Sequence, residues 1–294
     1  MDDLSEALVY ITLVDEVSCH RLKDSRSDCA MFNGCEGGYT GVASYRMEPG
    51  STISHFRLQK KLGEGGMGSV YLAEDLTLSR KVAIKFMSRE ELAKQANPKL
   101  IENLEQRFIR EARSAAAINH PNVAQIYEAN FEEDNWYIAM EFISGSALCD
   151  LVRDGDTVPI DKVIQILAQS VAGLRFAWDH YKIVHRDIKP HNIMLTEAEQ
   201  VKIVDLGLAK PVAAADPEFE MPELTGAGVP VGTPQYMAPE QAAGEPDIDH
   251  RADIFALGAT AYELLTGQKA FNEKTAPMIY IAQMKKKYTP LKDL

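Results

Sequence analysis

Residues 183–195 place a short charged cluster between two apolar runs, in the order IVHRDIKPHNIML. Apolar runs tend to be buried, whereas charged side chains are rarely buried unless they are paired. The pattern therefore predicts a loop held between two buried elements. Three of its side chains can take part in chemistry, because Asp187 can accept a proton, Lys189 can contact a phosphate and Asn192 can hold a metal ion.

A glycine-rich stretch at residues 63–68 lies between two segments rich in β-forming residues, 55–62 and 69–73. A dinucleotide-binding turn would lead into a helix, so these flanks favour a β-hairpin instead. A P-loop would need Gly-Lys-Ser/Thr after the glycines, and none follows. On its own the segment is compatible with an ordinary hairpin, but glycines also let backbone amides come close to phosphates.

The next strand pattern, residues 82–86, contains a single lysine, Lys85. A lysine buried in an apolar strand needs an anionic partner, although an exposed lysine on an edge strand would not. Apolar residues at helical spacing predict a helix over about residues 104–116, and Glu111 lies in it. Glu111 is therefore the candidate partner of Lys85.

The second half of the chain is predicted to be mainly helical. After a hinge at residues 141–143, the expected elements are a helix over 160–181, a hairpin over 193–204, an apolar helix over 252–265 and a helix over 277–287. Asp205 begins an Asp-Leu-Gly sequence at the end of a strand, where such a sequence alone would usually be a turn.

The composition excludes several classes of protein. The chain has 294 residues, a formal net charge of −12 and a pI of about 5.1, which argues against a nucleic-acid-binding protein. It has no run of 18 apolar residues that could span a bilayer. Its 4 cysteines show no paired CxxC spacing, which favours free thiols in a reducing, cytoplasmic compartment.

Residues 1–54 are expected to form an N-terminal extension and linker with little order. Leucine, isoleucine and valine at helical spacing predict one amphipathic helix over residues 3–17, and a polar, glycine-rich stretch follows. Three cysteines in this region match no standard zinc-ligand spacing, so we interpret them as unrelated thiols. We expect the functional protein to start near Met47, which mass spectrometry of native N-terminal peptides can check.

Taken together, these motifs resemble those of eukaryotic-like (Hanks-type) serine/threonine protein kinases. The resemblance covers residues 55–294 and includes the activation-segment anchor, GTPQYMAPE, at residues 232–240. It implies an α+β fold with two lobes: a small antiparallel β lobe with one helix over 55–143, and a larger, mainly helical lobe over 144–294. It also implies ATP and Mg²⁺, with Mn²⁺ as an alternative ion, and protein substrates with serine or threonine hydroxyls.

The resemblance further implies a nucleotide-binding set. In this chain the set is Leu62, Gly63, Gly65, Gly68, Val70, Ala83, Lys85 and Met140. By analogy with the family, the glycines would cover the phosphates, Val70 and Ala83 would enclose the adenine, and Met140 would be the gatekeeper. Lys85 would hold the α- and β-phosphates with Glu111 behind it.

The same resemblance implies the chemical roles. Asp187 would orient the substrate hydroxyl and accept its proton, and Lys189 would stabilise the transferred phosphoryl group. Asn192 and Asp205 would bind the metal ion. Thr225 is the candidate regulatory phosphosite, since the other hydroxyl groups between Asp205 and residue 240 belong to the anchor motif.

The chain departs from the family at two places. Leu206 replaces the phenylalanine of the usual Asp-Phe-Gly sequence, but it is still apolar, so we expect metal binding to persist. The chain ends before the last helices of a kinase large lobe, which would leave Glu240 without its usual arginine and apolar surface of the 252–265 helix uncovered. The alternative function is therefore an ATP-binding scaffold with weak catalysis. A small-molecule kinase of related fold is disfavoured, because the segment at 232–240 usually shapes a platform for peptides.

Overall fold

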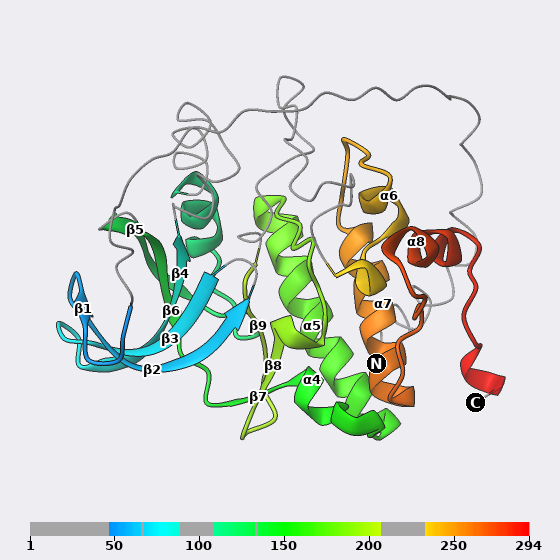
Figure 1. Cartoon of the computed structure of the whole chain (residues 1–294), viewed down its shortest axis with the longest axis horizontal. Helices are drawn as coiled ribbons and strands as arrows, with labels where there is room; N and C mark the ends of the chain where they lie inside the picture. Colours follow the sequence, from blue (N-terminus) through cyan, green and yellow to red (C-terminus); the bar gives the residue numbers. More distant parts are fainter. Residues whose placement is uncertain (1–46, 66–67, 89–108, 133–134, 207–232, 294) are drawn as a thin grey trace, which may run out of the picture.

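A computed structural model describes residues 47–65, 68–88, 109–132, 135–206 and 233–293. Within these ranges the chain forms two lobes side by side, a β-sheet lobe and a mainly helical lobe (Figure 1). The predicted two-lobed α+β fold is confirmed. The expected helix over residues 3–17 and the candidate phosphosite Thr225 lie outside the described residues.

The small lobe contains one antiparallel sheet in the strand order β1-β2-β3-β4-β6-β5. Its strands are β1 (Thr52–Ile53), β2 (Phe56–Gly65), β3 (Gly68–Asp75), β4 (Arg80–Ser88), β5 (Ile126–Glu132) and β6 (Asn135–Glu141). A helix over 109–116 packs against one face of this sheet. Strand β5 starts at Ile126, after a short segment that leaves the helix over 109–116. In that segment, Val123 forms an isolated bridge with Ile203 of the large lobe.

Alternation along the strands gives the sheet two apolar faces. On β4, Ile84 and Phe86 face a cluster that includes Phe56 and Tyr137. Ala83, one residue earlier than Ile84, faces the other cluster, next to the helix over 109–116. Lys85 lies on the same side of β4 as Ala83, so the strand pattern directs it towards the region between the lobes.

The small lobe begins earlier than the expected boundary at residue 55. Strand β1 pairs with β2, and Ile53 is buried in the sheet core. The Met47 carbonyl accepts a hydrogen bond from the Tyr71 hydroxyl at 2.8 Å. Residues 47–54 are thus part of the lobe because their apolar side chains complete one face of the sheet.

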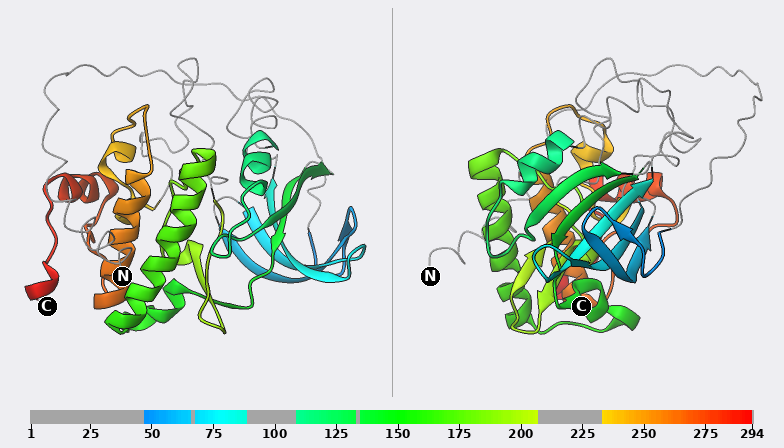
Figure 2. Two further views of the ribbon diagram at one scale, coloured as in Figure 1. Left: turned by 180° about the vertical axis from the view of Figure 1, so that it is seen from behind. Right: turned by 90° about the vertical axis from the view of Figure 1, so that its left-hand side faces the viewer.

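The large lobe is built on two helices, α5 (Ile160–Tyr181) and α7 (Arg251–Thr266), which lie side by side (Figure 2). The bounds of α5 match the prediction. The remaining elements are α4 (Leu148–Leu151), α6 (Pro239–Ala242), α8 (Ala276–Met284) and a small sheet of β7 (Gly145–Ala147), β8 (Ile193–Thr196) and β9 (Val201–Ile203).

Helix α7 is central, as its apolar sequence predicts, and it ends at Gly267 in a left-handed conformation with φ 68°. The expectation that its apolar surface would be uncovered is wrong for the described residues, where no large apolar side chain of α7 is exposed. Phe271, Ile279 and Ala282 pack near it together with its own Phe255. The chain after α7 therefore covers the helix, and exposed apolar side chains lie on α8 instead.

The glycine-rich segment forms the predicted hairpin, with Gly65 paired to Gly68. Gly68 has φ +124°, and a Cβ atom there would lie 1.8 Å from the backbone oxygen of Phe86. A Cβ atom at Gly63 would meet no atom within 4 Å. Packing against β4 therefore requires glycine at position 68, independently of any ligand.

We expect the Gly68→Ala substitution to lower the free energy of unfolding by about 3 kcal/mol, because the new methyl group collides with the β4 backbone at an unfavourable φ. The matched Gly63→Ala substitution should change it by less than about 1 kcal/mol. Urea unfolding of both variants provides the measurement. Equal destabilisation by the two substitutions would contradict the close approach of Gly68 to Phe86.

Candidate active site

The side chain of Asp253, on α7, binds the backbone of the loop over residues 183–195. The backbone N–H groups of His185 and Arg186 each donate to one carboxylate oxygen of Asp253, both at 2.8 Å. Asp253 is 4% exposed. Burial raises the pKa of this carboxyl group, while the two amide donors favour its charged form. The loop is therefore fixed to the central helix through its backbone.

Arg186 adopts a left-handed conformation, with φ 66°, that is uncommon for residues other than glycine. Both polar groups of its backbone are hydrogen-bonded. The N–H group donates to Asp253, and the carbonyl oxygen accepts from the Gln241 side-chain amide at 3.0 Å. Strained backbone persists where its surroundings determine it, and it is found often at functional sites.

Replacing Asp253 by asparagine should weaken this attachment. An asparagine offers one acceptor oxygen to two backbone donors, so one buried N–H group is left without a partner at a cost of about 1–3 kcal/mol. We expect a lower midpoint in urea unfolding and a kcat reduced about tenfold, because the loop loses its fixed position. The exposed Asp247, which lies outside the helices, gives the control substitution Asp247→Asn, which should leave both quantities unchanged. Unaltered stability of Asp253→Asn would contradict the role of the paired amide bonds.

His185 links the loop to the strand that precedes Asp205. Its Nδ1 atom accepts the Asp187 backbone N–H at 3.3 Å, so its Nε2 atom carries the proton and donates to the Val204 carbonyl oxygen at 2.9 Å. The Val204 N–H in turn donates to the Asn192 carbonyl oxygen at 3.0 Å. These bonds fix Asp187 and Asn192 relative to the backbone next to Asp205.

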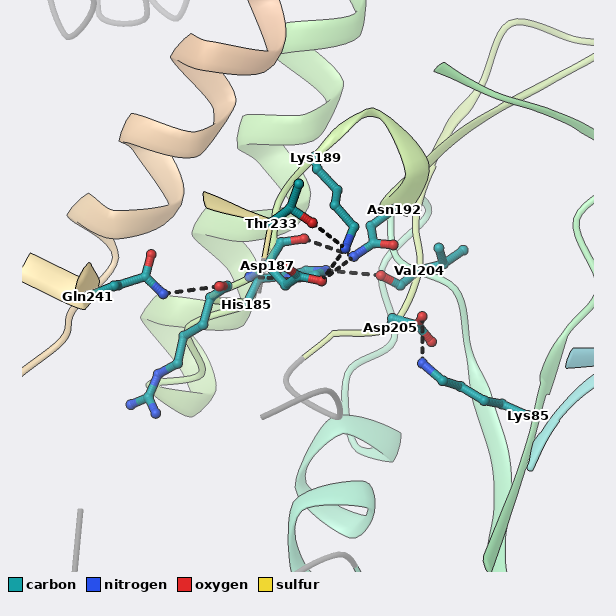
Figure 3. Close-up of polar contacts among 10 residues, drawn as sticks. Lys85, His185, Asp187, Lys189, Asn192, Val204, Asp205, Thr233 and Gln241 are labelled. Carbon is teal, nitrogen blue, oxygen red and sulfur yellow. Dashed lines mark hydrogen bonds and ion pairs between the residues drawn. The ribbon is translucent and has the colours of Figure 1, made fainter. Parts of the chain in front are cut away.

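Asp187, Lys189 and Asn192 form one hydrogen-bonded cluster (Figure 3). The Lys189 ammonium donates to Asp187 Oδ2 at 2.8 Å and to the Thr233 hydroxyl at 3.2 Å. The Asn192 side-chain amide donates to the same Asp187 oxygen at 3.1 Å and to the Asp187 carbonyl oxygen at 2.8 Å. The structure thus brings together the three loop residues that the sequence singled out, and adds Thr233 from the anchor motif.

The same bonds test whether a metal ion fits. Because the NH₂ group of Asn192 faces Asp187, its Oδ1 atom is directed away from Asp187 and is available to a cation. Asp205 provides a carboxylate after β9, with φ 61°. Two oxygen donors suit a Mg²⁺ ion, which is usually held by few protein ligands together with waters and phosphate oxygens. Leu206 is buried in the core of the large lobe, as expected for an apolar plug.

Lys85 contacts Asp205 across the two lobes, with Nζ and Oδ2 2.7 Å apart. Lys85 is 8% exposed, which excludes the alternative of a lysine that faces solvent. Glu111 lies in the helix over 109–116 and is exposed. The pairing of Lys85 with Glu111 stays a prediction, and the partner that the structure gives to Lys85 is Asp205.

Three residues of the predicted nucleotide-binding set, Val70, Ala83 and Met140, lie on one face of the small-lobe sheet. Strand register pairs Val70 with Lys85 and Ala83 with Met140, and paired residues point to the same face of a sheet. The side chains of Val70, Ala83 and Met140 belong to one apolar cluster. Leu62, on the strand that leads to the glycines, is 45% exposed. Val70, Ala83 and Met140 thus form an apolar surface next to the strand position of Lys85.

Glu240 lies at the end of the anchor motif, at the start of α6. Burial raises the pKa of its carboxyl group. Within the part of the chain that the structure describes, no basic side chain forms an ion pair with Glu240.

Two contacts near the anchor motif were not anticipated from the sequence. The Gln241 side-chain amide donates to the Arg186 carbonyl oxygen, and the Gln283 side-chain amide donates to the Pro234 carbonyl oxygen. No sequence motif marks either glutamine.

The structure thus holds a carboxylate with a lysine beside it, and a second carboxylate paired with a second lysine. These are the kinds of group that phosphoryl transfer requires. The family model for the protein kinase domain matches residues 56–292. The chain belongs to the protein kinase domain family.

Relatives of this chain include two bacterial kinases. It is 37% identical over 227 residues to the serine/threonine-protein kinase PknB of Mycobacterium leprae. The matched region covers 76% of this chain and 34% of that protein. The chain is 40% identical over 271 residues to the serine/threonine-protein kinase Pkn1 of Myxococcus xanthus, covering 87% of this chain and 36% of that protein. The chain thus spans about a third of the length of these relatives.

Among solved structures, the kinase domain of PknI from Mycobacterium tuberculosis has a TM-score of 0.60 and 24% identity, and the match covers 78% of this chain and 80% of that chain. This likeness supports the two-lobed fold. No helix among the described residues has the length and apolar character needed to cross a bilayer.

Proposed function

We propose that this chain is a serine/threonine protein kinase that transfers the γ-phosphoryl group of ATP to hydroxyl groups of protein substrates. The observation that carries the proposal is the cluster of Asp187, Lys189 and Asn192, held by Asp253 and facing Asp205 and Lys85. The HRDIKP sequence at residues 185–190, which contains Lys189, resembles the serine/threonine class and favours it over the tyrosine class.

The roles of the loop residues follow from their charges and contacts. Asp187 orients the substrate hydroxyl and accepts its proton as that oxygen bonds to the γ-phosphorus of ATP. The bond between the γ-phosphorus and the oxygen that bridges it to the β-phosphate breaks, and ADP leaves. Lys189 stabilises negative charge on the transferred group. Mg²⁺, when bound, neutralises charge on the ATP phosphates. Asn192 and Asp205 supply its protein oxygen ligands. The protein thus contributes chiefly by positioning and by charge stabilisation.

Lys85 and Asp205 must separate for this chemistry. Each neutralises the other at 2.7 Å. With nucleotide and metal ion bound, Asp205 would hold the metal ion, and Lys85 would contact the α- and β-phosphates with Glu111 as its partner. The apolar surface of Val70, Ala83 and Met140 would then contact the adenine.

Regulation through the activation segment is part of the proposal. Thr225 lies outside the described residues, and its candidate partner as a phosphothreonine is Arg186, whose backbone is fixed beside Asp187. Autophosphorylation at Thr225 would place charge near that arginine. A phosphopeptide map without phosphate at Thr225 after incubation with ATP would contradict this part of the proposal.

The described contacts disfavour an ATP-binding scaffold with weak catalysis. Lys189 is hydrogen-bonded to Asp187, and Asp253 of α7 holds the backbone of the loop that carries both residues.

We place the protein in the cytoplasm because of its cysteine pattern. We expect its partners to be proteins with serine or threonine hydroxyls.

Transfer of labelled phosphate tests the proposed function. The chain is incubated with Mg²⁺ and a generic protein substrate, using ATP labelled at either the γ- or the α-phosphate. Label from the γ-position alone should reach the substrate, and a chelator should abolish the transfer, because the metal ion is needed to neutralise the phosphates. Substrate that remains unlabelled by γ-labelled ATP would reject the proposal, and equal transfer from the α-position would reject the reaction type.

A further inference from the structure

Gln283 of α8 is a buried polar residue to which the kinase motifs assign no role. Its side chain is 3% exposed, and its amide N–H donates to the Pro234 carbonyl oxygen at 2.7 Å. Its Oε1 atom is buried without a hydrogen-bond partner. Burying a glutamine with half of its polar atoms unsatisfied is unfavourable. The bond to Pro234 is therefore the polar contact that this buried side chain makes.

Pro234 begins a single helical turn, Pro234–Tyr236, immediately after Thr233. Its carbonyl oxygen also accepts the Met237 N–H, at a longer distance of 3.3 Å. The Tyr236 hydroxyl donates to Glu263 of α7. Gln283 and Glu263 thus hold this turn from two different helices, and the Gln283 bond is the one next to Thr233.

Thr233 is in direct contact with the catalytic cluster, since its hydroxyl accepts a hydrogen bond from the Lys189 ammonium at 3.2 Å. A lysine side chain is long and flexible, so the position of its ammonium depends on the groups that bind it. Here those groups are Asp187 Oδ2 and the Thr233 hydroxyl. Movement of the turn would therefore move one of the two acceptors that hold Lys189.

Helix α8 is attached to α7 through apolar packing. Its buried Ile279 and Ala282 pack with Phe271, and Phe271 stacks on Phe255 with ring centroids 6.1 Å apart and an interplanar angle of 10°. Phe255 lies on α7 two residues after Asp253, which holds the catalytic loop. Gln283 and the loop are thus positioned relative to the same helix.

We propose that Gln283 is a positioning residue for phosphoryl transfer, which fixes the turn at Pro234 and, through the Thr233 hydroxyl, the ammonium group of Lys189. The inference rests on the proposed kinase function and extends it to a residue of α8 outside the active-site motifs. It assigns to α8 a part in setting the rate of the chemical step.

The test is a double-mutant cycle on kcat with the full chain, ATP, Mg²⁺ and a serine-containing peptide. Gln283→Leu keeps the side-chain volume and removes the donor, and Thr233→Val removes the hydroxyl. We expect each to lower kcat about tenfold without changing KM for ATP, and the double variant to be no slower than Thr233→Val alone, because residues that act through one another are not additive. A double variant whose loss of kcat equals the product of the two single losses would overturn the proposal.

A matched control separates the lost hydrogen bond from other changes on α8. Ile281, which is 47% exposed on the same helix, takes no part in the packing of Ile279 and Ala282, so Ile281→Val should have the kcat of the wild type. A loss of kcat in Ile281→Val as large as in Gln283→Leu would overturn the proposal. A wild-type chain that transfers no phosphate would reject both this inference and the kinase function, whereas an active wild type with an equally active Gln283→Leu rejects this inference alone.

A pH profile gives a second readout if Gln283→Leu does not fold. In Gln283→Glu, the introduced carboxyl group can donate to the Pro234 carbonyl oxygen only when it is protonated, and burial raises its pKa. The kcat of this variant relative to the wild type should therefore fall as the pH rises through that pKa. A ratio that is independent of pH would contradict the role of the donor.

Discussion

Replacing Asp187 by asparagine is expected to lower kcat for protein phosphorylation about 10³-fold, because the side chain that accepts the hydroxyl proton is lost. Asparagine keeps the shape of the residue and an oxygen for the Lys189 and Asn192 donors. The fold and the affinity for ATP should therefore be retained. Steady-state kinetics with a peptide substrate measure kcat, and calorimetric titration with ATP and Mg²⁺ measures binding.

The matched control for this substitution is Asp179→Asn on α5. Asp179 is exposed and contacts Arg175 within the same helix at 3.4 Å, so its loss should change neither kcat nor ATP affinity. A variant Asp187→Asn with a wild-type kcat would show that the proton is accepted elsewhere. Loss of ATP binding in that variant would show that Asp187 acts on the nucleotide instead.

Replacing Lys85 by methionine is the second substitution with a large expected effect. Methionine has a similar length and no charge, so the phosphates lose a cation and the Asp205 carboxylate loses the ammonium group that lies 2.7 Å from it. We expect kcat/KM for ATP to fall about 100-fold or more, as when one group that stabilises developing charge is removed. Kinetics at varied ATP concentration provide the measurement.

The control for Lys85 lies on the same strand. Lys81 is exposed on β4 opposite Glu74, away from the contact with Asp205. The Lys81→Met substitution removes one charge from the small lobe and should leave kcat/KM within about twofold of the wild type, because exposed charges contribute little. Equal effects of the two substitutions would mean that net charge, rather than the site of Lys85, governs nucleotide use.

The sequence predicted much of the fold because local patterns decide it. Strand alternation located the glycine-rich hairpin and the strand of Lys85, and helical spacing gave the bounds of α5. Strand β1 was missed because it has only two residues, too few to show a period. Its burial depends on pairing with β2, which a local pattern does not reveal.

The candidate site was predictable where a motif carries it and not where tertiary contacts decide. The cluster of Asp187, Lys189 and Asn192 lies within six residues of sequence, so its proximity followed from the loop itself. The contact of Lys85 with Asp205 joins residues 120 positions apart, and that of Gln283 with Pro234 joins residues 49 apart. Such contacts depend on how the lobes and α8 pack, and no local spacing encodes them.

The central claim is that the cluster around Asp187 transfers phosphate from ATP to serine and threonine hydroxyls of proteins. Mass-spectrometric mapping of phosphate on a protein substrate, after incubation with ATP, Mg²⁺ and either the wild type or Asp187→Asn, tests it most directly. We predict phosphate on serine or threonine with the wild type and almost none with the variant. Equal phosphorylation by both proteins, or phosphate on tyrosine alone, would contradict the claim.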